Sequence, residues 1–112
     1  AYTEGAWARF LEVLTEYPDD AEAIHWLLRA GTAQNRWQEL GEHLRLYTAR
    51  NPEDLAARFA FTSVLLRGGQ IEAARREYDG LCKIDPQYDG LVQLGQAIVG
   101  REAALAMEAA SS

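Results

Sequence analysis

The sequence predicts an all-α fold made of antiparallel helical hairpins that stack side by side. The three prolines, Pro18, Pro52 and Pro86, follow one another at intervals of 34 residues. Between successive prolines lie two amphipathic stretches whose apolar residues recur at helical spacing. The composition, 48% hydrophobic and 25% charged, is typical of a folded globular chain. Together these observations predict two helices in each 34-residue period.

Each proline is expected to lie in a turn between two helices. Proline disfavours helical geometry in the residue before it and has no N–H, yet it fits the first turn of a following helix. Acidic residues follow the first two prolines, Asp19 and Asp20 in one turn and Glu53 and Asp54 in the other. At a helix N-terminus such carboxylates cap free N–H groups and interact favourably with the helix dipole. We therefore expect a helix to start soon after each proline.

Two complete hairpins are predicted, over residues 21–54 and 55–88. The apolar residues of the first fall in two helical blocks, Ile24, Leu27, Leu28, Trp37, Leu40, Leu44 and Tyr47. Those of the second are Phe59, Phe61, Leu65, Leu66, Ile71, Ala74, Tyr78 and Leu81. Asn35 and the pair Gly68-Gly69 separate the two blocks, and both favour a turn.

The second hairpin carries a recognisable set of residue types. Gly69 stands at the turn, Ala74 at a small position of the second helix, Tyr78 at an aromatic position, and Asp85-Pro86 at the end. In this set, and in its period, the unit resembles a tetratricopeptide repeat (TPR). The resemblance implies a right-handed superhelical stack of hairpins, a TPR-like solenoid.

The first hairpin resembles the family less closely. Asn35 suits the turn, but Leu40 replaces the small residue of the second helix. Leu28 occupies another position where the family prefers glycine or alanine. We therefore expect looser or shifted packing in this hairpin.

The whole chain, 1–112, is expected to form one domain. Residues 2–18 resemble the second helix of a partial repeat. Residues 89–99 resemble a capping or partial-repeat helix that ends at Gly100, and 100–112 are expected to form a helical or frayed tail.

The resemblance implies a non-catalytic protein–protein interaction module. In this family the first helices of the hairpins line a concave groove that holds a peptide or a helix of a partner protein. The residues at groove positions are Glu22, His25, Trp26, Arg29, Ala56, Phe59, Ala60, Ser63, Arg67, Gln93 and Ala97. Trp26 and Phe59 offer apolar contact, unless they only pack between helices, and the basic residues can hold carboxylates. We expect a ligand with apolar anchors and an acidic group.

Other function classes find little support in the sequence. The net charge of −6 argues against nucleic-acid binding, and no apolar run approaches the roughly 18 residues of a membrane span. His25 and His43 fall on different predicted helices and form no metal-binding pair. We expect no catalytic site, metal or cofactor. The single cysteine, Cys82, fits a reducing compartment, so a cytoplasmic location is expected.

Two alternative functions stay open. The chain could be a repeat region appended to a larger bacterial enzyme such as a glycosyltransferase or a methyltransferase, by analogy with similar arrays. It could also be a homodimerising scaffold, because the first helix lacks a neighbour on one side. In that case Trp7, Phe10 and Leu14 are expected to be partly uncovered and to form the self-association surface.

Overall fold

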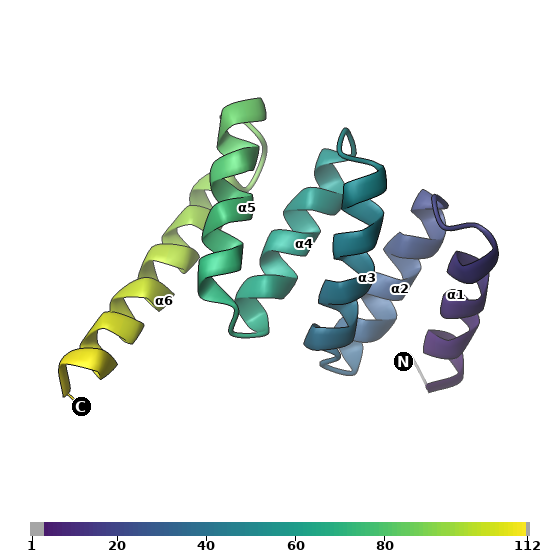
Figure 1. Ribbon diagram of the computed structural model, residues 1–112, viewed down its shortest axis with the longest axis horizontal. Helices are drawn as coiled ribbons and strands as arrows, with labels where there is room; N and C mark the ends of the chain where they lie inside the picture. Colours follow the sequence, from purple (N-terminus) through teal and green to yellow (C-terminus); the bar gives the residue numbers. More distant parts are fainter. Residues whose placement is uncertain (1–3, 112) are drawn as a thin grey trace.

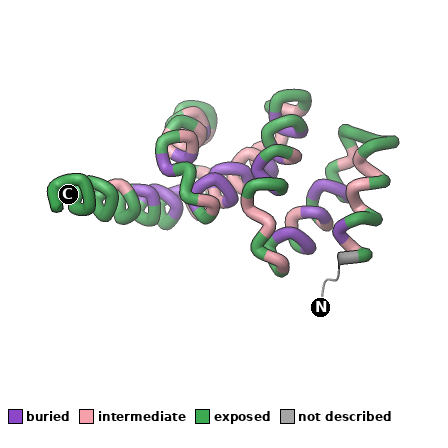
Figure 2. Tube along the Cα trace, turned by 60° about the horizontal axis from the view of Figure 1, so that its bottom comes forward, coloured by how far each residue is buried: buried purple, intermediate pink, exposed green. Residues whose placement is uncertain are grey.

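The computed structural model describes residues 4–111, and this range contains six helices and no strand. Successive helices run antiparallel and alternate between two layers. The odd-numbered helices lie in front in Figure 1 and above the even-numbered ones in Figure 2. The predicted all-α fold is confirmed. The helices are α1 (Glu4–Glu16), α2 (Ala21–Ala33), α3 (Trp37–Arg50), α4 (Leu55–Arg67), α5 (Ile71–Ile84) and α6 (Leu91–Ser111).

The helix boundaries recur with the period of the prolines. Helices α2 and α4 each have 13 residues and start at Ala21 and Leu55, which are 34 positions apart. Helices α3 and α5 each have 14 residues and start at Trp37 and Ile71, again 34 positions apart. Each of these pairs, α2–α3 and α4–α5, is one helical hairpin.

The turns that lead into α2 and α4 are capped by aspartates. The Ala23 N–H donates to Oδ1 of Asp20 over 3.1 Å, and the Ala57 N–H donates to Oδ1 of Asp54 over 3.1 Å. These bonds satisfy N–H groups of the first helical turn, which have no partner within the helix. The predicted role of the acidic residues after Pro18 and Pro52 is thus confirmed for one residue in each turn.

The turn inside each hairpin contains one residue with a positive φ angle. Asn35 has φ 55° between α2 and α3, and Gly69 has φ 84° between α4 and α5. Glycine adopts this left-handed region freely, and asparagine does so at a lower cost than most other residues. The predicted place of both residues in the turns is confirmed.

The core lies between the two layers and runs along the stack. Thr62 is the polar exception among its most enclosed side chains, and its hydroxyl donates to the Arg58 carbonyl over 2.9 Å. That bond removes the cost of burying the hydroxyl. The largest fully buried side chains are Leu27, Leu40, Leu44, Leu81, Ile98 and Thr62.

Of the two expectations for the first hairpin, looser or shifted packing, the structure shows the shifted one. Leu40 is fully buried where the second hairpin has Ala74, one period later. Gly31 is also buried, and the second hairpin has Leu65 at its position. The large and the small residue have therefore changed helices, and the space between the two helices stays filled.

The C-terminal helix joins the predicted capping helix to the tail, and of the two expected states of the tail, helical or frayed, the structure has the helical one over 100–111. Helix α6 has 21 residues and continues through Gly100, so the predicted end at that glycine is wrong. A glycine inside a helix costs only about 1 kcal/mol relative to alanine, and strong helix formers follow it. Glu102 accepts hydrogen bonds from Nε and Nη2 of Arg75 on α5 over 2.9 and 2.6 Å. Beyond this pair, residues 103–111 are exposed, as Figure 2 shows near the C-terminus. Within residues 4–111, no helix has both the length and the apolarity needed to cross a membrane.

Trp7 of α1 belongs to the core. Its side chain is only 3% exposed, so the expectation that it is partly uncovered is wrong. The ring of His43 on α3 meets it edge-on with 6.1 Å between centroids, and the guanidinium carbon of Arg36 lies 4.9 Å from the ring centroid. Helix α3 and the turn before it therefore cover the indole. Phe10 and Leu14 are half-buried and pack against the core.

Candidate functional site

A pocket of about 100 Å³ lies between α2 and α4, the first helices of the two hairpins. Most of its wall is apolar, and four of the lining residues are alanines. Their short side chains leave the space between the two helices open. We call it the α2–α4 pocket, and its lining residues are Ala21, Ile24, His25, Leu28, Leu44, Asp54, Ala56, Ala57 and Ala60.

Asp54 gives the pocket one fixed polar group. Besides capping α4, its carboxylate accepts a hydrogen bond from the Tyr47 hydroxyl, with 2.7 Å between Oδ2 and the phenolic oxygen. Burial, and then this hydrogen bond, raise the pKa of Tyr47 well above its ordinary value. Tyr47 therefore stays protonated and remains a hydrogen-bond donor to Asp54 over the whole physiological pH range.

An aromatic cluster centred on Trp26 adjoins the pocket. Phe10 of α1 stacks on the indole with 6.3 Å between centroids and an interplanar angle of 15°. The ring of His25, which also lines the pocket, meets the indole edge-on at 5.6 Å. The guanidinium carbon of Arg29 lies 5.4 Å from the ring centroid, a cation–π distance. Because Trp26 is half-buried and both basic residues are exposed, the cluster presents an aromatic edge and positive charge together.

The predicted groove residues fall into separate groups. His25, Trp26 and Arg29 lie together on α2, and Glu22 is exposed in the first turn of the same helix. On α4, Phe59 packs against Tyr88 with 5.6 Å between ring centroids.

The remaining predicted positions are more dispersed. Arg67 lies at the end of α4, where its guanidinium carbon is 5.3 Å from the ring centroid of Trp37. Arg67 therefore faces the start of α3 rather than the cluster around Trp26. Ser63 is half-buried on α4, and Gln93 is exposed on α6.

Sequence reasoning missed six residues that line the pocket. It assigned Ile24, Leu28 and Leu44 to the core and Asp54 to a helix cap, and it gave Ala21 and Ala57 no role. The available signal was the pair of alanines, Ala56 and Ala60, which the family pattern places on the groove side. Two small residues one helical turn apart leave a gap that a neighbouring helix must fill or leave open.

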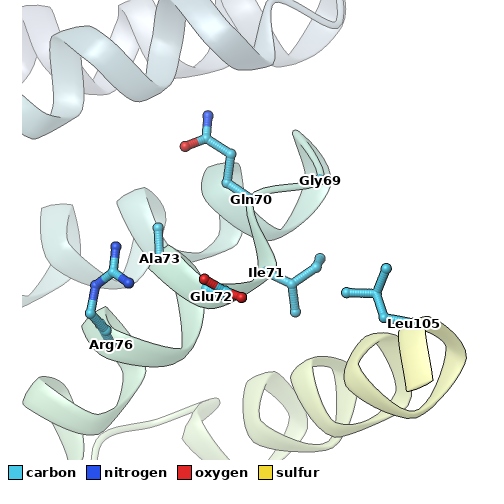
Figure 3. Close-up of a pocket in the computed structure, with 7 residues that line it drawn as sticks. All are labelled: Gly69, Gln70, Ile71, Glu72, Ala73, Arg76 and Leu105. Atoms are coloured by element: carbon cyan, nitrogen blue, oxygen red, sulfur yellow. The ribbon is translucent and has the colours of Figure 1, made fainter. Parts of the chain in front are cut away.

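Another pocket, of about 380 Å³, lies at the other end of the chain and contains none of the predicted groove residues. Figure 3 shows the side chains of Ile71 and Leu105 facing each other across it, with Glu72 and Arg76 on the α5 side. It is an open space between the start of α5 and the second half of α6. Because α6 diverges from α5 here, Leu105 is left 49% exposed.

Charge is divided between the two rims of the stack, where the turns lie. The turns that join α1 to α2, α3 to α4 and α5 to α6 form one rim, at the top of Figure 1. They contain no lysine or arginine, although Arg50 directly precedes one of them and pairs with Asp19, and we call this the acidic rim. The turns at the opposite rim contain Arg36 and no acidic residue, and Arg67 directly precedes one of them. The acidic rim carries Asp19, Asp20, Glu53, Asp54, Asp85 and Asp89.

Within residues 4–111, no group of three or more His, Cys, Asp or Glu side chains is arranged to hold a metal ion. Comparisons of the chain with protein-family models, with curated proteins and with solved structures give no match. Any function is therefore inferred from the chain's own surface.

Proposed function

We propose that the chain is a TPR-like, right-handed superhelical array that binds a peptide or a helix of a partner protein, without catalysis, in a groove along α2 and α4. The observation that carries this proposal is the α2–α4 pocket. In the TPR family the first helices of the hairpins line the groove, and α2 and α4 hold that place here. The recurrence of helix boundaries every 34 residues supports the array.

The size of the pocket indicates what it binds. An apolar cavity of about 150 Å³ holds a benzene molecule. The α2–α4 pocket, at about 100 Å³, suits a smaller aliphatic side chain such as leucine or isoleucine. Burying such a side chain contributes about 1.5–3 kcal/mol, which makes it an anchor for a longer segment.

The surroundings of the pocket favour an acidic group near the anchor. Arg29 and His25 lie beside Trp26, next to the pocket mouth. A carboxylate on the ligand can accept charge-assisted hydrogen bonds from Arg29 while an apolar side chain contacts the indole. The proposed ligand is therefore a segment with a leucine or isoleucine anchor and an aspartate or glutamate close to it.

Peptide selection followed by affinity measurement tests the proposal. A displayed library of random peptides is selected on the wild-type chain, and the enriched peptides are titrated calorimetrically. In the variant Ala60→Leu a larger side chain fills the pocket, whereas Ala104→Leu adds the same side chain to the exposed surface of α6. We expect enriched peptides to combine an aliphatic anchor with an acidic residue. Ala60→Leu should weaken their binding by at least about tenfold, which corresponds to about 1.4 kcal/mol, and Ala104→Leu should leave it unchanged.

Equal affinity of wild type and Ala60→Leu for every enriched peptide would contradict the proposal. So would the enrichment of peptides without an aliphatic residue. Circular dichroism and the thermal midpoint of both variants establish that they keep the fold, so that a loss of binding reflects the filled pocket.

A further inference from the structure

A pocket of about 180 Å³, distinct from the two described above, lies between α1 and α3. It shares only Ile24 with the α2–α4 pocket, and its other walls come from the opposite layer of helices and from the turn at Pro18. We call it the α1–α3 pocket. Its lining residues are Leu14, Pro18, Ile24, His43, Leu46, Tyr47 and Arg50.

The same kind of pocket recurs one period later, between α3 and α5, with about 260 Å³. There the ion pair of Arg58 and Glu77, 3.9 Å apart, replaces Ile24 and His43 of the α1–α3 pocket, and Thr48 replaces Leu14. The repeat thus builds a pocket at this place in two successive periods, and the α1–α3 pocket is the more apolar of the two. The later pocket is lined by Arg45, Thr48, Ala49, Pro52, Arg58, Phe61 and Glu77.

The mouth of the α1–α3 pocket exposes apolar surface. Leu46 is 49% exposed, and the residue one period later is Gly80, so this leucine is specific to the first hairpin. Tyr17, beside Pro18, is 61% exposed. An apolar pocket with exposed apolar residues at its mouth is characteristic of a surface that a partner covers.

No carboxylate is among the described lining residues of this pocket, but two carboxylates are hydrogen-bonded to them. Arg50 lines the pocket, and its Nε and Nη2 donate hydrogen bonds to the two carboxylate oxygens of Asp19 over 2.9 and 3.2 Å. Tyr47, another lining residue, donates a hydrogen bond from its hydroxyl to Asp54 over 2.7 Å. Asp19 and Asp54 therefore lie beside a wall that itself carries Arg50 and His43. Glu53 precedes Asp54 in the same turn of the acidic rim.

We propose that the α1–α3 pocket is a second binding site, which takes a leucine-type side chain from a lysine- or arginine-rich segment of a partner protein. The apolar wall accommodates the side chain, and the carboxylates beside it attract the flanking cations. Asp54 adjoins both sites, because it also lines the α2–α4 pocket. The two proposed ligands differ in charge because the α2–α4 pocket also adjoins Arg29, whereas Asp19 and Glu53 lie in the rim turns beside the α1–α3 pocket.

A titration followed by nuclear magnetic resonance tests this proposal with defined probes. The first probe is a synthetic peptide with a central leucine and three lysines on each side. The second has alanine at the centre, and the third has glutamates in place of the lysines. We expect saturable shifts of the Leu14, His43 and Leu46 amides with the leucine peptide, at least about fivefold weaker binding of the alanine peptide, and no saturable shifts with the glutamate peptide.

Two leucines of equal exposure provide the matched variants. Leu46→Ala removes part of the pocket wall and should weaken binding of the leucine–lysine peptide by about fivefold. Leu105→Ala alters a leucine that is likewise 49% exposed but lies on α6, and it should leave binding unchanged.

Three results would overturn the proposal. One is equal binding of the leucine and alanine peptides, and another is unaltered binding to Leu46→Ala. The third is self-association of the chain, detected by sedimentation velocity, together with concentration-dependent shifts of the same amide resonances without peptide. A second copy of the chain would then occupy the pocket. None of these results depends on Ala60→Leu, so the failure of this site and that of the α2–α4 pocket are distinguishable.

Discussion

Leu40 occupies the space that a side chain on Gly31 would need. A Cβ on Gly31 would lie 2.5 Å from Cγ of Leu40 and 2.7 Å from Cζ3 of Trp7, well inside contact distance. One period later the same two positions hold Leu65 and Ala74. The two hairpins thus fill equivalent interhelical space from opposite sides, one from its second helix and the other from its first.

Gly31→Ala should destabilise the chain, although alanine is the better helix former. We expect a loss of about 1–3 kcal/mol in the free energy of unfolding, the usual cost of overpacking a core. Urea denaturation measures it. Gly100→Ala is the matched control, because Gly100 also lies inside a helix but a Cβ there meets no atom within 4 Å. That substitution should stabilise the chain by up to about 1 kcal/mol, and a gain in both variants would show that the space beside Gly31 is not filled.

Trp7 and Trp26 should respond differently to truncation, although each contacts a histidine and an arginine. Trp7→Ala removes a side chain that is 3% exposed and should cost about 3–5 kcal/mol of unfolding free energy. Trp26→Ala should cost much less, because that side chain is half-buried. Thermal unfolding of the two variants provides the comparison, and equal losses would mean that Trp7 is not enclosed by α3.

Gly69→Ala should lower stability purely through the backbone. With φ at 84° the position lies in the left-handed region, and no heavy atom within 4 Å would meet the new Cβ. The expected cost is about 1–2 kcal/mol, measured as a lower midpoint in denaturant. Asn35→Gly, at the equivalent turn with φ 55°, should not lower stability. An unchanged midpoint in Gly69→Ala would indicate that the turn relaxes to another conformation.

The link between α5 and α6 should weaken in acid. Hydrogen bonds from Arg75 lower the pKa of Glu102 below its ordinary value of 4.5. Because the folded pKa is the lower one, the stabilising contribution is fully present above pH 4.5 and is lost as the pH falls through the folded value. The protection factors of amides in residues 99–111, that is, their hydrogen-exchange rates relative to the intrinsic rates at the same pH, should therefore fall in that acidic range.

A pH titration that follows the side-chain carboxyl carbons of Glu102 and Asp19 by nuclear magnetic resonance tests the same link directly. Arg75→Gln should move the titration midpoint of Glu102 back towards 4.5. Asp19, whose pKa is lowered by Arg50 and Asn51, should keep its midpoint in this variant and serves as the internal control. An unchanged midpoint for Glu102 would mean that the pair with Arg75 does not persist in solution.

The parts of the fold that the sequence predicted depend on local interactions. Asp20 and Asp54 each accept a hydrogen bond from the N–H group three residues ahead, at the start of a helix. The turn residues Asn35 and Gly69 act through their own φ angles. The parts it did not predict depend on contacts between distant residues. The burial of Trp7 is such a case, since it requires α3 to lie beside α1 and to place His43 against the indole ring.

The candidate site shows the same division. Family positions on α2 predicted a group that includes Trp26 and Arg29, and the structure brings these two side chains together. The family positions did not predict where Phe59 and Arg67 point. Phe59 meets the ring of Tyr88, and Arg67 meets the ring of Trp37 on α3. A side chain's position on its own helix follows from spacing, whereas its direction depends on which neighbouring ring it meets.

The carboxylates in the turns of the acidic rim extend the attraction for a basic segment beyond contact at the α1–α3 pocket itself. At 0.1 M salt this attraction reaches roughly 10 Å into solvent, so it acts before contact. For the basic ligand proposed above, the association rate is therefore expected to fall steeply as salt is added.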